Sequence, residues 1–324
     1  MNRRWTIWLA ALTCAAATGA FAAQGGNVKV TPLGSHDGEF CPQDRALIFE
    51  DPNGTRVLYD PGRTVAGAQD PRLGGKIDVV LVTHMHGDHV GNAHIPAVNT
   101  GECGKPDVSV SALPNTLAVS IAMAHKSKIV TGSEMPTFFQ AKLRAAGGNP
   151  ADAILARFGG SVTVGGVRIA TVTAMHSNGV DPSYIGGELG KLMSAAGIFG
   201  YAGDATGYVL TFSNGLVAYL SGDTGITSDQ ERVVRGQYGA RLAVMNIGDG
   251  FTTGPREAAY VINDLVKPNS VIASHANEVG TKGGKPVPGS KTETFIKLVK
   301  VPVHVPLSGK TMEFDPAGKC VGGC

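Results

Sequence analysis

The sequence predicts an α/β protein built as a four-layer αββα sandwich, in which two mixed β-sheets pack face to face and helices flank them. Three observations lead to this fold class. Strand-like and helix-like segments alternate in both halves of the chain, each half also contains a hairpin, and one apolar run has the composition of a strand buried on both faces. The 324 residues, 43% hydrophobic and 17% charged, are enough for a substantial core.

The first half begins with a predicted hairpin. Residues 45–50 and 55–59 are strand-like and flank Asp51-Pro52-Asn53-Gly54, a sequence with strong turn preference. The next strand is expected at residues 76–83, Lys-Ile-Asp-Val-Val-Leu-Val-Thr, because a nearly continuous β-branched run is typical of a strand covered on both sides. This strand leads directly into a cluster of histidines.

The remaining elements follow from apolar spacing and turn residues. Apolar residues at helical spacing predict two surface helices, over residues 116–126 and 137–146. Two pairs of strands are expected next, at residues 161–164 with 167–174 and 207–212 with 216–221. The final third then alternates strand, helix, strand and helix, over residues 242–247, 255–265, 271–275 and 292–299.

The N-terminus has the pattern of a secretory signal peptide over residues 1–22. Arg3 and Arg4 precede a mostly apolar stretch, and Ala20-Phe21-Ala22 is a suitable cleavage site. A membrane anchor is the alternative, but it would need about 20 consecutive apolar residues, and threonines and a glycine leave this run shorter. We therefore expect residues 23–324 to form a single domain in the periplasm or outside the cell, with no stable membrane insertion after cleavage.

Four cysteines follow residue 22, namely Cys41, Cys103, Cys320 and Cys324. An even number in an exported protein predicts disulfide bonds, with three connectivities open. Cys320 and Cys324 enclose a glycine-containing loop that would close on itself, and Cys41 and Cys103 would then form the longer bridge. A zinc site is the alternative, although these spacings differ from a C-x-x-C pair.

The charge balance argues against a polyanionic partner. Removal of residues 1–22 takes away two arginines and no acidic residue, so basic and acidic residues balance at 26 each. Such a chain lacks the basic surface that nucleic-acid binding leaves in a sequence. We expect a small-molecule partner, and the oligomeric state stays open.

Three histidines and an aspartate lie directly after the predicted buried strand: His84, His86, Asp88 and His89. At alternate positions, His84 and His86 can point in the same direction, while Asp88 and His89 on the following turn can face a second point nearby. Imidazole and carboxylate together are ligands for zinc, and also for iron or manganese. The cluster therefore predicts metal binding.

This motif, within the string Thr-His-Met-His-Gly-Asp-His-Val-Gly-Asn of residues 83–92, resembles the H-x-H-x-D-H signature of the metallo-β-lactamase superfamily. Members of that superfamily draw their remaining ligands from later strand ends, in the order histidine, aspartate, histidine. Three residues of this chain end predicted strands in that order: His176, Asp223 and His275. The resemblance implies the metallo-β-lactamase fold, which is the four-layer arrangement expected above.

The resemblance also implies a binuclear site with two divalent ions, foremost Zn²⁺, with Fe or Mn as alternatives. One ion would be bound by His84, His86 and His176, the other by Asp88, His89 and His275, with the carboxylate of Asp223 between them. The nucleophile would then be hydroxide between the metals rather than a side chain, and Asp88 and Asp223 would be the catalytic carboxylates.

Asp60 matches an early strand-end aspartate of the superfamily, which supports the loop carrying His84 and His86. An ordinary Asp-Pro turn is the alternative. The other histidines, His36, His94, His125 and His304, are expected to be ordinary surface or core residues.

Residues 245–259 and the following Lys267-Pro268 are similar to the branch of the superfamily that contains ascorbate-phosphate lactonase. The chain departs from that branch at Ala276, where an aromatic residue is usual, and at Asp249, where glycine is frequent. Aspartate at position 223 counts against true β-lactamases, and His86 counts against the flavodiiron redox proteins.

These features predict an exported, binuclear metal-dependent hydrolase acting on an ester or lactone. Phosphodiesters and then β-lactams are the alternative substrates, and a metal-loaded binding or sensing protein without turnover is the non-enzyme alternative. Residues 181–204 are expected to form either an apolar flap over the site or a helix at 187–196 packed into the core. The loop after His275 offers Asn277, Lys282 and Lys285 as anion or oxyanion binders, with solvated lysines as the more common alternative.

Overall fold

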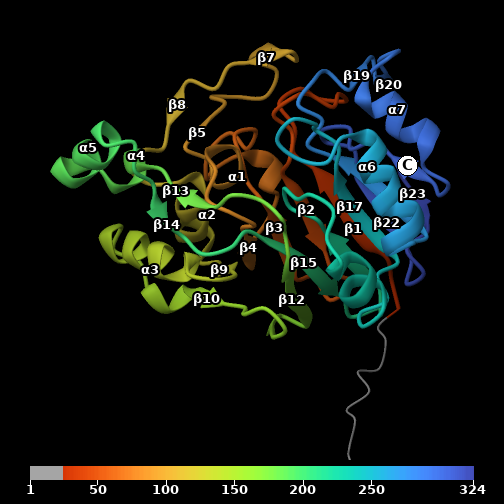
Figure 1. The fold of residues 1–324 in the computed structure, drawn as a ribbon, viewed down its shortest axis with the longest axis horizontal. Helices are drawn as coiled ribbons and strands as arrows, with labels where there is room; N and C mark the ends of the chain where they lie inside the picture. Colours follow the sequence, from red (N-terminus) through yellow and green to blue (C-terminus); the bar gives the residue numbers. More distant parts are fainter. Residues whose placement is uncertain (1–24) are drawn as a thin grey trace, which may run out of the picture.

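A computed structural model describes residues 25–324, and the predicted signal peptide at residues 1–22 lies outside the described residues. Two large sheets form the centre of the molecule (Figure 1). The spatial order of strands in the first sheet is β10 (Ala153–Leu155), β9 (Lys128–Thr131), β4 (Val79–Leu81), β3 (Arg56–Tyr59), β2 (Leu47–Glu50), β1 (Val28–Pro32), β22 (Met312–Phe314) and β23 (Cys320–Gly322). The order in the second is β11 (Ser161–Val164), β12 (Val167–Thr173), β15 (Thr206–Thr211), β16 (Val217–Leu220), β17 (Leu242–Asn246), β18 (Ser270–Ser274) and β21 (Val303–His304).

The alternating side chains of β4 explain how the layers are held together. Val79 and Leu81 belong to the apolar cluster between the two sheets, where they join residues of β15, β16 and β17. Val80 belongs to a separate cluster on the outer side, together with residues of the helices that cover the first sheet. All three side chains are fully buried, so the prediction of a strand covered on both faces is confirmed, over a shorter span.

Helices cover the outer side of each sheet, which confirms the predicted four-layer arrangement (Figure 1). Those on the first sheet are α2 (Leu117–His125) and α3 (Met135–Ala145), and those on the second are α6 (Pro255–Tyr260), the π-helical η4 (Val261–Val266) and α7 (Lys291–Leu298). The hydroxyl of Thr116 accepts the N–H of Val119 at 3.2 Å and so caps α2 at the predicted place. Among residues 25–324, no helix has the length and apolar character that crossing a bilayer requires.

All three predicted strand pairs are antiparallel. β2 pairs with β3, β11 with β12, and β15 with β16. Shorter elements complete the described chain: η1 (Pro71–Leu73), η2 (Pro150–Asp152), η3 (Gln230–Arg235), and the two-stranded pairs β5 (Ala93–His94) with β8 (Val110–Ser111), β6 (Gly101–Glu102) with β7 (Lys105–Pro106), β13 (Gly179–Val180) with β14 (Gly200–Tyr201), and β19 (Thr281–Lys282) with β20 (Lys285–Pro286).

Residues 181–204 contain the expected helix, but it is not packed into the core. α4 (Pro182–Ile185) is followed by α5 (Gly187–Ala195), which lies at the left edge of Figure 1, away from both sheets. Leu189 and Leu192 of α5 are each 61% exposed, and within the helix only Gly190 is buried. The core-helix interpretation is therefore wrong, because the apolar face of this amphipathic helix has no partner within the described chain.

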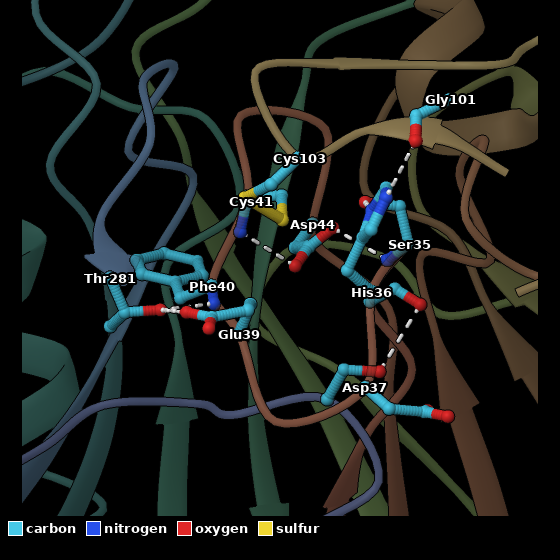
Figure 2. The surroundings of a disulfide bond; sticks show 12 residues. Ser35, His36, Asp37, Glu39, Phe40, Cys41, Asp44, Gly101, Cys103 and Thr281 are labelled. Atoms are coloured by element: carbon cyan, nitrogen blue, oxygen red, sulfur yellow. Dashed lines mark hydrogen bonds between the residues drawn. A yellow bond between two sulfur atoms is a disulfide. The ribbon is translucent and has the colours of Figure 1, made fainter. Parts of the chain in front are cut away.

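The structure pairs the cysteines as expected, Cys41 with Cys103 and Cys320 with Cys324. Figure 2 shows the first bridge beside the buried carboxylate of Asp44, which accepts the N–H groups of Ser35 at 2.9 Å and of Cys41 at 2.8 Å. The bridge and these hydrogen bonds anchor the loop that enters β2. That loop also carries residues of the candidate site.

Candidate metal centre

Strand ends of both sheets meet at one edge of the sandwich and carry all seven predicted ligands. His84 and His86 follow β4, and the short helix α1 (Gly87–Val90) presents Asp88 and His89. His176, Asp223 and His275 follow β12, β16 and β18 in turn. β16, β17 and β18 are parallel, and carboxyl ends of parallel strands lie at the same sheet edge.

The ligand atoms form three compact groups, each with its atoms within 4.8 Å of one another. One group contains His84, His86 and His176, a second contains Asp88, His89 and His275, and a third joins Asp223 to His84 and His89. The first two groups are the two triads that the resemblance implies.

Asp223 stands between the triads. Its Oδ2 atom lies 3.1 Å from Nε2 of His275 and 3.3 Å from Nε2 of His89. The same oxygen lies 3.8 Å from Nε2 of His176 and 3.9 Å from Nε2 of His84. One carboxylate oxygen therefore faces imidazoles of both triads, which is the position a bridging ligand occupies.

Several of these atoms are buried without a hydrogen-bond partner among the described residues: Nε2 of His84, Nε2 of His89, both ring nitrogens of His275 and Oδ1 of Asp223. Leaving a buried polar atom unpaired costs about 1–3 kcal/mol. Cations bound in this cluster would satisfy the Nε2 atoms of the three imidazoles and the carboxylate of Asp223, and imidazole with carboxylate is a donor set for Zn²⁺, Fe or Mn. The residues present thus fit a metal centre.

The buried carboxylate of Asp60 fixes the side chains of this cluster by hydrogen bonds. Asp60 is fully buried with a positive φ of 39°, and its carboxylate accepts the N–H of Thr83 at 2.9 Å and the hydroxyl of Thr83 at 2.8 Å. The same carboxylate lies 2.9 Å from Nδ1 of His89, and the Thr83 hydroxyl lies 3.0 Å from Nδ1 of His84. Asp60 therefore orients His89 directly and His84 through Thr83, instead of supporting His84 and His86 as the resemblance implies.

The charges of the cluster shift its protonation equilibria. Burial disfavours ionisation of Asp223, but His89 and His275 outweigh it and hold the pKa of this carboxyl well below its usual range. Burial lowers the pKa of His84 well below its usual value, so its imidazole is neutral at pH 7. Burial opposes protonation of His89 as well, yet Asp223, Asp60 and Asp88 together raise its pKa to about 10. A metal ion that binds His89 must therefore displace a proton.

A cavity of about 380 Å³ opens onto the cluster. It is lined by five of the seven predicted ligands, and also by six other residues: Gln43, Arg45, Arg63, Ser177, Phe251 and Asn277. Of these six, the sequence analysis named only Asn277 as a binding residue, while Lys282 and Lys285 are exposed on the β19–β20 pair outside the lining. Ser177 follows the predicted ligand His176, and Phe251 lies within residues 245–259, which resemble the lactonase branch, but neither was expected to line the site. Gln43, Arg45 and Arg63 come from loops without a recognisable motif, and no periodic signal could have found them.

Among residues 25–324, one other group of potential ligands and the single residue His94 lie outside this cluster. His304 lies near Cys320 and Cys324, but the two sulfurs form a disulfide and so offer no thiolate to a metal. The ring of His94 contacts the carbonyl oxygen of Ile95 at 2.8 Å and does not line the cavity. The expectation that these histidines are ordinary residues agrees with their surroundings.

Comparisons with known proteins agree with this architecture. Residues 55–276 match the family model described as a beta-lactamase superfamily domain, a span that contains all seven clustered residues. The chain is 30% identical over 253 residues to a UPF0173 metal-dependent hydrolase of Koribacter versatilis, covering 77% of this chain and 87% of the relative. It is also 30% identical over 271 residues to a UPF0173 metal-dependent hydrolase of Thermococcus onnurineus, covering 82% of this chain and 95% of the relative.

Solved structures show the same fold at lower identity. Igni18, a metallo hydrolase from Ignicoccus hospitalis, is 22% identical with a TM-score of 0.57, covering 89% of this chain and 99% of that structure. An isothiocyanate hydrolase from Delia radicum gut bacteria is 17% identical with a TM-score of 0.53, covering 89% of this chain and 99% of that structure. From the family match, the relatives and the geometry together, the chain belongs to the beta-lactamase superfamily and, within it, to the metal-dependent hydrolases.

Proposed function

We propose that this protein is an exported hydrolase that holds two divalent metal ions and cleaves an ester or lactone of a small molecule. The observation that carries the binuclear assignment is the position of Asp223, whose Oδ2 atom lies between 3.1 and 3.9 Å from imidazole nitrogens of both triads. A single-ion site would not need a carboxylate facing both triads.

In this proposal His84, His86 and His176 hold one ion, Asp88, His89 and His275 hold the other, and Asp223 contacts both. Zn²⁺ is the first candidate, with Fe or Mn as alternatives, because the donors are imidazole and carboxylate. When bound, such ions supply Lewis acidity and lower the pKa of water.

The chain's own residues then position the reacting groups. The Asp60 carboxylate fixes Nδ1 of His89, so that Nε2 points toward Asp223. Arg45 holds Oδ2 of Asp88 at 2.7 Å, and with His89 it offsets burial and keeps the pKa of this carboxyl well below its usual range. Asp88 lines the cavity, where its ionised carboxylate is placed to hold one ion and to orient the attacking water by accepting a hydrogen bond from it.

The substrate class is supported by the size and lining of the cavity. About 380 Å³ lies at the lower end of the range for small-molecule pockets. The lining carries only two cationic side chains, Arg45 and Arg63, and the first is already paired with Asp88. This favours an ester or lactone over a phosphodiester. Export is supported by the pattern of residues 1–22 and by the two disulfides.

The test combines metal analysis with a substrate panel. Residues 23–324 are purified, and bound metal is counted by mass spectrometry before and after loading with Zn²⁺, Mn²⁺ or Fe²⁺. We expect two ions per chain in the wild type, at most one in Asp223→Ala, and two in a control, Asp204→Ala, which changes an exposed carboxylate outside the cavity lining.

Hydrolysis of esters, lactones, phosphodiesters and β-lactams is then compared among the three proteins. Turnover of esters or lactones that disappears in Asp223→Ala supports the proposal. Cleavage of phosphodiesters alone would make the substrate assignment wrong. Two bound ions without any turnover would instead indicate a binding or sensing protein.

A further inference from the structure

Six residues of the cavity lining do not belong to the predicted metal ligands, and apart from the apolar Phe251 they are polar and include both arginines of the cavity. Their side chains come from five loops that the fold brings together. The loop entering β2 carries Gln43 and Arg45, and the loops after β3, β12, β17 and β18 carry Arg63, Ser177, Phe251 and Asn277 in turn. Because they line the cavity, those of these side chains that remain free would contact the substrate of the hydrolase proposed above.

Arg45 is not available to a ligand. Its side chain is only 4% exposed, and its Nη2 atom lies 2.7 Å from Oδ2 of Asp88 and donates to Oδ1 of Asn277 at 3.0 Å. Its Nη1 atom donates to the carbonyl oxygen of Pro42 at 3.2 Å. Arg45 is therefore a positioning residue, which holds Asp88 and Asn277 in place.

Arg63 differs because its charge has no counterpart. Within residues 25–324, no carboxylate lies within 4.0 Å of its guanidinium, and only its Nε atom is used, donating to Oδ1 of Asn92 at 2.9 Å. The two terminal Nη atoms remain for another partner. Arg63 is thus the single cation of the cavity lining that is not paired with a carboxylate.

The backbone around Arg63 is held firmly against α1. The N–H of Gly62 donates to the carbonyl oxygen of His89 at 2.9 Å, and a Cβ atom at Gly62 would lie 2.7 Å from the backbone oxygen of Asp88. The side chain of Asn92 lies where a Cβ atom at Gly87 would stand, 2.4 Å from its Cγ. Gly62 and Gly87 therefore allow the close contacts that place Arg63 and its partner Asn92 beside the metal ligands.

We propose that Arg63 is a substrate-binding residue and that the substrate carries a carboxylate group in addition to the ester or lactone bond; this inference rests on the proposed hydrolase function. A guanidinium with two free Nη atoms matches the two oxygens of a carboxylate. One unpaired cation balances one negative charge, which favours a carboxylate over a doubly charged phosphate.

The test uses a matched pair of esters, 4-nitrophenyl hydrogen glutarate and 4-nitrophenyl pentanoate, which differ at the end of the acyl chain by a carboxylate. They are assayed with the zinc-loaded wild type, Arg63→Gln, Arg63→Lys and the control Arg144→Gln, which removes an exposed arginine of α3 outside the cavity lining. We expect the wild type to prefer the glutarate ester, and Arg63→Gln to lose about tenfold or more in kcat/KM for that ester alone. Arg63→Lys should retain part of the preference, and Arg144→Gln all of it.

A second measurement does not depend on turnover. Binding of glutarate to the same zinc-loaded proteins is followed by calorimetry, with zinc content measured in each. If glutarate binds more weakly to Arg63→Gln than to the wild type at unchanged zinc content, the inference is supported. If neither ester is cleaved by the wild type, the proposed hydrolase function is wrong, but this binding result still stands. Equal binding to wild type and Arg63→Gln, or an equal loss of kcat/KM for both esters, would overturn the inference. A third ester, 4-nitrophenyl 4-phosphonobutanoate, carries a phosphonate in place of the carboxylate. If the wild type has a higher kcat/KM for this ester than for the glutarate ester, and Arg63→Gln loses that preference, the carboxylate assignment would be overturned.

Discussion

Asp60 provides a direct test of how the fold prepares the metal centre, through the substitution Asp60→Asn. The carboxylate is fully buried, and its Oδ2 atom faces the hydroxyl of Thr83 at 2.8 Å and Nδ1 of His89 at 2.9 Å. In Asp60→Asn, Oδ1 would still accept the N–H of Thr83, and an NH₂ group would replace Oδ2. Because NH₂ only donates, it could not accept the hydrogen bonds from the Thr83 hydroxyl and from Nδ1 of His89.

The expected magnitude follows from those two contacts. Hydrogen bonds to a charged group contribute about 1.5–3 kcal/mol each, and the removal of a buried charge offsets part of their loss. We therefore expect the free energy of unfolding of the metal-free protein to fall by about 2–3 kcal/mol. Because Asp60 orients His89 directly and His84 through Thr83, zinc affinity should also fall, by about 10–100-fold.

Urea unfolding and competition with a chromogenic zinc chelator measure these two effects separately. Asp70→Asn is the matched control, because Asp70 is also buried, pairs with Arg72 at 2.7 Å, and lies outside the metal cluster. It should lose stability but keep wild-type zinc affinity. The reasoning is wrong if Asp60→Asn binds zinc within about twofold of the wild type, or if Asp70→Asn weakens zinc binding equally.

Two further predictions concern stability. The Cys41–Cys103 bridge spans 62 residues, so replacing both cysteines by serine should cost about 4 kcal/mol in chemical denaturation, whereas the four-residue span of Cys320–Cys324 should cost about 2 kcal/mol; equal losses would contradict this dependence on loop length. Burial lowers the pKa of His304 below its usual 6.5, so the unfolded state takes up a proton first and stability is lost as the pH falls below about 6.5. Urea unfolding at several pH values between 5 and 8 should show a weaker pH dependence in His304→Gln, and an unchanged dependence would refute the assignment.

Local sequence patterns correctly predicted those helices and strands whose apolar spacing and turn residues lie within a few positions of one another. The hairpin of β2 and β3 follows from a turn sequence between two apolar segments, and α2 follows from apolar spacing after the capping residue Thr116. The position of α5 could not be predicted from such local patterns. Leu189 and Leu192 lie at helical spacing, but spacing does not reveal whether another element covers them, and within the described chain none does.

The sequence by itself determined the fold class, and it indicated the seven side chains of the candidate metal centre. The motif after a buried strand is local and specific and supplies four of them, whereas His176, Asp223 and His275 follow from resemblance to the ligand order of the superfamily. Only the tertiary structure decided which side chains share the cavity with them. Arg45 is placed by a loop tied to Cys103 through Cys41, and Arg63 is placed by backbone contacts with α1. Such placements depend on contacts between segments far apart in the chain, which no local spacing contains. The same holds for Asp223, whose contact with both triads arises only when the two sheets pack together.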